Sequence, residues 1–343
     1  MASGPCVGIV ANPASGRDIR RLVGGASVFG NADKAGMVLR ALIGLGAVGV
    51  RRALMMPAAD GLGSALERQL QGRAAVATSP LPELEVLRQR LTGTAADSTT
   101  AVEAMCDAGA DAILVLGGDG THRAVAKACG DVPICALSTG TNNAFPEMRE
   151  ATVAGMAIGL AVAGRGGPHA LRQEAALAVE APGGRTDLAL VDVSLTNERF
   201  VGARALWHPD ALREVVVTMA DPAAVGLSAL AGLLAPFERG SGRGLHVLLA
   251  PSAADARLVL EVPLAPGLVA PVAVAGFRSL ELGDTVRLGG EGSLALDGER
   301  EIELRDGAPA HVRLVPGPAR IDLDAVMRHH AASHATWVQP VAD

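Results

Sequence analysis

Short apolar runs alternate with amphipathic stretches over the first 150 positions of the chain. The runs at 7–11, 53–56 and 112–116 are almost wholly apolar, which is typical of strands buried on both faces of a parallel sheet. Between the first two, positions 33–45 carry apolar residues at helical spacing. This alternation predicts βαβ units, and therefore an N-terminal α/β domain built on a parallel sheet.

The same reading extends this α/β pattern along the chain. Further helices are expected at 63–70, 97–108, 122–129 and 151–163, and further strands at 74–77 and 132–137.

From residue 175 onward the pattern becomes short apolar runs separated by Gly, Pro and Asp, which indicates an antiparallel β-sandwich or barrel. Its strands are expected at 175–180, 188–195, 212–219, 245–250, 258–262, 269–275, 285–288, 294–296, 302–304 and 311–315. We therefore predict an α/β nucleotide-binding domain at 1–148 and a β-rich substrate domain at 149–320. A tail at 321–343 is expected to begin as a helix and to return to the first domain.

Composition and charge argue against a nucleic acid or a membrane as the partner of this protein. The 343 residues carry a net charge of −6, which disfavours a nucleic-acid role because such proteins leave a basic footprint. The longest apolar stretches, 151–164 and 223–237, fall short of the ~18 residues of a membrane span, and the N-terminus lacks a secretory signal. We expect a cytoplasmic homodimer with neither a membrane nor a nucleic-acid partner.

The first candidate motif follows the strand at 112–116 and consists of Gly117, Gly118, Asp119, Gly120 and Thr121. Three glycines around an aspartate let the backbone approach an anion, and the following helix adds its positive N-terminus. The carboxylate at this place either holds Mg²⁺ or accepts a hydroxyl proton. Alternatively, the segment is an ordinary strand-to-helix turn with a capping aspartate.

Asn12, Ser15, Gly16 and Arg17 follow the first strand and offer an amide, a hydroxyl and a cation suited to bidentate phosphate contact. Taken alone, this segment reads better as an Asn-Pro turn with a serine cap. In an open α/β sheet, however, ligands bind at the carboxyl ends of the strands, where this segment and the first motif would meet.

A third loop at the same edge contains Thr139, Gly140, Thr141, Asn142 and Asn143. Its hydroxyl and amide groups suit a ribose or a phosphate oxygen, although a plain polar loop has the same composition.

The fourth motif, Asp297-Gly298-Glu299, stands between two apolar runs in the predicted β-rich domain. Asp-Gly in this setting is a strong hairpin signal. Together with the other three motifs, its two carboxylates offer a base that activates an acceptor hydroxyl, a contribution typically worth about 10²–10⁴-fold.

Other phosphate and metal signatures are excluded. Residues 44–49 fit G-x-G-x-x-G, but they follow a helix and precede a strand, the reverse of the dinucleotide-binding order. No P-loop pattern occurs. Nothing near His330 and His334 completes a coordination sphere, so no metal site made of protein ligands alone is predicted.

In this order the four motifs resemble the NAD kinase/diacylglycerol kinase superfamily. Residues 9–22, 138–146 and 200–207 look closest to one branch, the acetoin catabolism protein X group. The resemblance covers about residues 5–320. It implies ATP and Mg²⁺ in a cleft between an α/β and a β-rich domain, with Asp119 essential for phosphoryl transfer.

We therefore expect an ATP-dependent kinase that phosphorylates a hydroxyl of a small-molecule acceptor, NAD-like or related to the acetoin pathway. Its catalytic residues would be Asp119, Glu299 and Asp297. The alternative is a catalytically silent nucleotide-binding regulator of acetoin catabolism. A lipid kinase ranks lower, because no basic amphipathic helix marks a membrane-facing surface.

Overall fold

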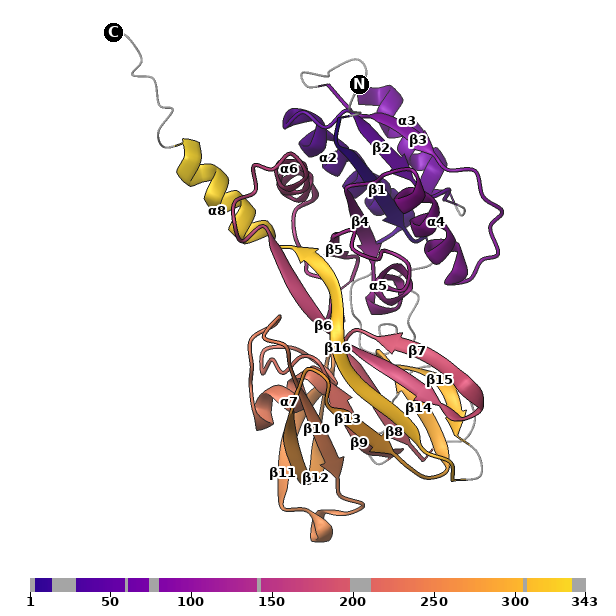
Figure 1. Ribbon diagram of the computed structural model, residues 1–343, viewed down its shortest axis with the longest axis vertical. Coiled ribbons are helices and arrows are strands. Elements are labelled where there is room, and N and C mark those ends of the chain that lie inside the picture. Colours follow the sequence, from indigo (N-terminus) through magenta and orange to yellow (C-terminus); the bar gives the residue numbers. More distant parts are fainter. Residues whose placement is uncertain are drawn as a thin grey trace.

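The computed structural model describes residues 4–13, 29–58, 61–73, 80–140, 143–197, 211–304 and 307–334. The N-terminal strands and helices form one unit, and most of the later strands form a second (Figure 1). Two long strands, β6 (Leu171–Ala181) and β16 (Ala310–Ile321), run between the two units.

The first unit is built on the parallel sheet that the sequence predicted, and its strands run in the order β3-β2-β1-β4-β5. These are β1 (Cys6–Ala11), β2 (Arg52–Met55), β3 (Glu83–Val86), β4 (Ala112–Gly117) and β5 (Ile134–Ser138). Every residue of β1 and β4 is buried, because helices cover both faces of the sheet.

One face carries α2 (Asn31–Ala47), α3 (Leu62–Arg73) and α6 (Ala151–Val162), and the other carries α4 (Ala96–Asp107) and α5 (Asp119–Ala126). Helices α2 and α6 touch backbone to backbone. A Cβ on Gly44 would lie 2.1 Å from the Thr152 carbonyl oxygen, and one on Gly155 would lie 2.2 Å from that of Ala41. Gly44, the first glycine of the pattern at 44–49, therefore serves helix packing.

The sheet continues beyond the first unit. Strand β16 runs antiparallel to β6 along most of its length, and near its end Arg320 pairs with Ile134 of β5. Strands β7 (Arg185–Ala189) and β13 (Thr285–Leu288) complete this sheet, and the short 3₁₀ helix η1 (Pro182–Gly184) joins β6 to β7. Helix α8 (Leu323–His334) follows β16, and its Val326 is buried in the same core as α2 and α6.

A second, antiparallel sheet packs against β6, β13 and β16, so the β-rich part is the sandwich that the sequence predicted. Its strands run in the order β11-β12-β10-β9-β8-β14-β15. They are β8 (Asp192–Thr196), β9 (Leu212–Val217), β10 (Arg243–Leu249), β11 (Leu258–Ala265), β12 (Leu268–Glu281), β14 (Gly292–Leu296) and β15 (Glu299–Leu304), accompanied by α7 (Leu227–Leu234) and η3 (Ala253–Asp255).

One predicted strand differs in detail. The run at 188–195 is two strands, β7 and β8, because the N–H groups of Leu190 and Val191 donate to the Asp297 carboxylate at 3.0 and 2.8 Å. The run at 74–77 lies outside the described residues. The predicted domain boundaries remain predictions, although α6 lies beyond residue 148 and packs on the core of the first unit.

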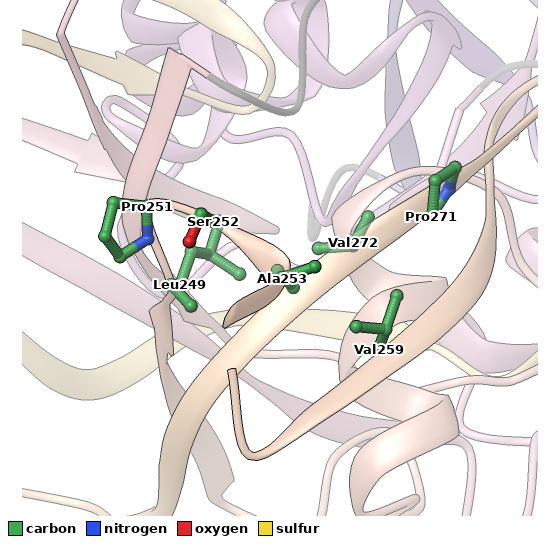
Figure 2. A pocket seen from close by; sticks show the side chains of 9 residues that line it. Leu249, Pro251, Ser252, Ala253, Val259, Pro271 and Val272 are labelled. Carbon is green, nitrogen blue, oxygen red and sulfur yellow. The ribbon is translucent and has the colours of Figure 1, made fainter. Parts of the chain in front are cut away.

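A surface cavity of about 180 Å³ opens on β10, β11 and β12 (Figure 2). Its lining is almost wholly apolar, including Leu249, Val259 and Val272, with Ser252 as a polar member and no charged side chain. Those strands carry none of the four candidate motifs, so this cavity does not suit a phosphate. Of the helices that the structure describes, none is long and apolar enough to cross a membrane.

Candidate functional site

The turn between β4 and α5 brings the backbone of the first motif close to its neighbours. A Cβ on Gly117 would lie 2.6 Å from the Cβ of Thr121, and one on Gly118 would lie 2.9 Å from Asn143 Oδ1. Neither glycine has a positive φ, so close packing requires them and a left-handed backbone does not. Gly118 thereby places the third motif directly against the first.

Hydrogen bonds join the strand ends at this edge. Asn12 Nδ2 donates to Thr121 Oγ1 at 3.0 Å, which connects the end of β1 to the start of α5. The Thr139 N–H donates to the Gly117 carbonyl at 3.3 Å. Asn143 Nδ2 donates to Ser138 Oγ at 2.6 Å and to the Gly140 carbonyl at 3.3 Å. The described parts of the three N-terminal motifs therefore meet at one place.

Five residues of the predicted site, Ser15, Gly16, Arg17, Thr141 and Asn142, lie outside the described residues. Their part in the site stays a prediction.

The Asp119 carboxylate links the first motif to the residues that directly follow the third. Oδ1 accepts the Phe145 N–H at 2.8 Å, and the Ala144 N–H lies 3.1–3.2 Å from the two carboxylate oxygens. Backbone donors thus fix the orientation of this side chain at the N-terminus of α5.

Glu299 reaches the same helix start from the β14–β15 hairpin. A Cβ placed on Gly120 would lie 3.8 Å from Glu299 Oε1. Among the described residues, nothing else outside the helix backbone and the chain neighbours of Gly120 comes within 4 Å of that position. The hairpin turns as its Asp-Gly sequence predicted, with positive φ at Asp297 (51°) and Gly298 (78°).

Asp297 is buried beneath this hairpin, with a side chain that is 0% exposed. Its Oδ1 accepts the N–H groups of Leu190 and Val191, and its Oδ2 lies 3.8 Å from Arg123 Nε of α5. Burial raises the pKa of Asp297 to about 7, against the opposing effect of Arg123. Asp297 therefore fastens the hairpin to α5 and to the residues that directly precede β8.

The raised pKa of Asp297 makes the stability of the fold depend on pH. Its folded-state pKa of about 7 exceeds the ordinary aspartate value of 3.8, so its contribution to stability is full below about pH 4 and is lost as pH rises through about 7. We expect the free energy of unfolding of the wild type, relative to Asp297→Asn, to fall between pH 5 and pH 8. Urea titrations of both proteins measure this difference. The contributions of other titrating groups, such as His122, are common to both proteins and cancel. A pH-independent difference would contradict it.

One lysine and two arginine side chains at this site were not predicted from the sequence. Lys34 of α2 is 1% exposed and donates to the carbonyl oxygens of Asn12 and Pro13 at 3.0 and 3.1 Å. Arg239 and Arg320 donate to main-chain carbonyls of the segment that follows Asn143. No motif marks these residues, although a lysine on the apolar side of the amphipathic helix at 33–45 is a usable signal.

Lys34 is expected to hold the Asn12 segment in place. Lys34→Met should lower the free energy of unfolding by roughly 1–3 kcal/mol, because two carbonyls lose their charged donor. Lys127, the other lysine of the chain, is 36% exposed and paired with Asp187, so Lys127→Met should cost less than about 1 kcal/mol. Denaturant titration of both variants compares them. Equal losses would contradict this role for Lys34.

The donor set at this edge suits Mg²⁺ only in company with a phosphate ligand. Within the described ranges, no three His, Cys, Asp or Glu side chains gather closely enough to hold a metal ion. Mg²⁺ is usually bound by one or two carboxylates together with substrate phosphates and water. Asp119 provides one such carboxylate at the start of α5.

Known proteins match both parts of the chain. Residues 7–162 match the ATP-NAD kinase N-terminal domain, and residues 175–317 match the acetoin catabolism protein X C-terminal domain. Acetoin catabolism protein X of Cupriavidus necator is 46% identical over 337 residues, which cover 96% of this chain and 93% of that protein.

Two solved structures from Bacillus anthracis str. Sterne, a diacylglycerol kinase and a putative diacylglycerol kinase, have TM-scores of 0.47 and 0.49 at 14% identity. They cover 94% and 95% of this chain, and 97% and 99% of their own. The high identity to the Cupriavidus protein over nearly the whole of both chains confirms the resemblance found in the sequence. An NAD kinase-like N-terminal domain is followed by the C-terminal domain typical of the group, and the chain belongs to the acetoin catabolism protein X family.

Proposed function

We propose that the protein is an ATP-dependent phosphotransferase that acts on a hydroxyl of a small metabolite. The observation that supports this most is the approach of Glu299, from the β-rich part, to Gly120 at the start of α5. It sets a carboxylate opposite a helix N-terminus, where anions bind well. Phosphoryl transfer to a hydroxyl requires an anion-binding group on the phosphate side and a base on the hydroxyl side. The N-terminus of α5 and the Glu299 carboxylate would supply these two groups.

The nucleotide would lie at the carboxyl ends of β1, β4 and β5. Backbone N–H groups at the start of α5 would face its phosphates, and side chains of the surrounding loops would orient it. Mg²⁺-ATP supplies the phosphoryl group when it is bound. We assign its binding to Asn12, Ser15, Gly16, Arg17, Gly117, Gly118, Gly120, Thr121, Thr139, Gly140, Thr141, Asn142 and Asn143.

On the acceptor side we assign Glu299 as the general base that takes the hydroxyl proton. Asp119 keeps the helix start and the Asn143 loop in register and provides negative charge for the metal ion. Asp297 is buried, so it acts as a positioning residue that fixes the hairpin carrying Glu299. Catalysis would consist mainly of positioning and charge neutralisation, as is general for phosphoryl transfer.

Gly120→Ala tests whether the space beside Glu299 is the phosphate site. The added methyl would lie 3.8 Å from Glu299 Oε1, so it fits the unliganded fold, and Ala favours a helix over Gly by roughly 0.5–1 kcal/mol. We expect unchanged or higher stability with at least about tenfold weaker binding of ATP, measured by calorimetry. A site that must admit phosphate oxygens close to the backbone has no room for this methyl.

Gly72→Ala in α3 is the matched control, because a Cβ there meets nothing within 4 Å. It should stabilise the helix similarly and leave ATP affinity unchanged. Wild-type ATP affinity in Gly120→Ala would place the nucleotide elsewhere.

One observation favours a second candidate function, a nucleotide-binding regulator without turnover. The Asp119 carboxylate already accepts the N–H groups of Ala144 and Phe145, which suits a structural role. Such a regulator would bind ATP saturably and transfer phosphate to no acceptor. Glu299→Gln would then have little effect on ATP binding.

A further inference from the structure

The two residues that hold Asp119 are themselves held from their other side. Ala144 and Phe145 donate their N–H groups to the Asp119 carboxylate. Their carbonyl oxygens accept from one side chain, Arg239, whose Nη2 and Nη1 each lie 2.6 Å from Ala144 O and Phe145 O. This dipeptide therefore joins a carboxylate of the α/β part to a guanidinium of the β-rich part.

Arg239 comes from a tight turn between α7 and β10. The Ser241 N–H donates to the Glu238 carbonyl at 3.2 Å, and Gly240, with φ of 75°, occupies the position of the turn that favours glycine. The backbone that carries Arg239 is thus fixed locally. Its side chain is 25% exposed, so a substitution is easier to accommodate here than at the buried Arg320.

Arg320 of β16 supports the same dipeptide from the sheet. Its Nη1 donates to the Phe145 carbonyl at 2.9 Å, and its Nη2 lies 2.7 Å from Glu147 Oε1. Glu174, with a side chain that is 2% exposed, lies 3.7 Å from Arg320. These carboxylates compensate two neighbouring guanidinium groups, and the pKa of Glu147 is lowered mainly by Arg320 and then by Arg239, against the effect of its own burial.

The chemistry of this contact is specific to arginine. A planar guanidinium presents parallel N–H donors that match two adjacent oxygen acceptors, whereas a lysine ammonium is a single point of charge. The dipeptide carbonyls are adjacent acceptors of that kind, and Arg239 binds both at once.

We propose that Arg239 is a positioning residue for the candidate site. By fixing Ala144 and Phe145 it orients the Asp119 carboxylate, so the β-rich part sets the geometry of the helix start that would bind phosphate. The catalytic consequence rests on the phosphotransferase function proposed above, but the effect on the dipeptide does not.

Arg239→Lys tests this role, because it keeps the charge and removes the paired contact. Arg243→Lys is the control: Arg243 lies on the adjoining strand, is 46% exposed, and comes no closer than 3.8 Å to Glu281. Hydrogen exchange of the Ala144 and Phe145 amides is followed by NMR in the full-length proteins. We expect exchange at least about tenfold faster in Arg239→Lys, with the melting temperature nearly unchanged, and wild-type exchange in Arg243→Lys.

Steady-state kinetics supply the second readout. For an active enzyme we expect kcat of Arg239→Lys to fall at least about tenfold while KM for ATP changes little, since misplacement of a reacting group acts mainly on turnover. Unchanged amide exchange overturns the proposal, and so does faster exchange with an unchanged kcat. If the wild type transfers no phosphate, the proposed function fails, and the exchange data alone decide whether Arg239 fixes the dipeptide.

Discussion

Asp119→Asn is expected to lower the rate of phosphate transfer by roughly 10³-fold or more. An asparagine has one acceptor oxygen, and its amide would turn a donor toward the N–H groups of Ala144 or Phe145, which now share a carboxylate. The variant also loses the negative charge that would attract the metal ion. Single-turnover transfer from labelled ATP, together with ATP binding by calorimetry, separates the loss of chemistry from the loss of affinity.

Asp111→Asn is a fitting control for this change. Asp111 immediately precedes β4, at the end opposite the site, and its carboxylate also accepts a backbone N–H, that of Cys6 at 2.8 Å. It should lose some stability, of the order of 1 kcal/mol, and keep the wild-type transfer rate. Full activity in Asp119→Asn would remove Asp119 from the proposed mechanism.

Glu299→Gln is expected to lower kcat by about 10²–10⁴-fold, the usual contribution of a general base, while ATP still binds. Glutamine keeps the size of the side chain next to Gly120 but does not take up a proton. Steady-state kinetics and calorimetry measure the two effects. Glu261→Gln, at an exposed position of β11, should behave as the wild type.

A wild-type kcat in Glu299→Gln would show that the base lies elsewhere. Loss of ATP binding together with kcat would instead make Glu299 part of the nucleotide site.

The α/β part of the fold was predictable because its buried strands are continuous apolar runs. The runs at 7–11 and 112–116 correspond to β1 and β4, which are buried along their whole length. Strand β3 was not predicted, because it lacks such an apolar run. It lies at the sheet edge, and most of its residues, Glu83–Val86, are exposed, so it has no apolar run to reveal it.

The sandwich was predictable as a class, but its connection to the first unit was not. Strand β16 extends past the predicted run at 311–315 to Ile321 and pairs with β5, so one sheet continues through both parts. The residues that make this extension include Pro316 and Gly317, which interrupt the apolar pattern. Pairing with β6, including a register shift between Pro316 and Ala319, stabilises this part of β16 although its own sequence does not indicate a strand.

The candidate site was predictable where the turns and loops at strand ends require particular residue types. Glycine, asparagine and aspartate at strand ends identified the start of α5 and the hairpin that carries Glu299. Lys34 and Arg239 escaped prediction because their acceptors are main-chain carbonyls, which every residue has. The burial of Asp297 was likewise hidden, since its donors at 190–191 are more than a hundred residues away in the chain.

Phosphate transfer itself is the most direct test of the proposed function. ATP labelled at the γ-phosphate, with Mg²⁺, is incubated with NAD, NADH, acetoin and a cytosolic metabolite extract, using wild type and Asp119→Asn side by side. We predict that label enters a new compound with the wild type alone, and that this compound identifies the acceptor class. Saturable ATP binding without transfer to any acceptor would contradict the phosphotransferase and favour the regulator.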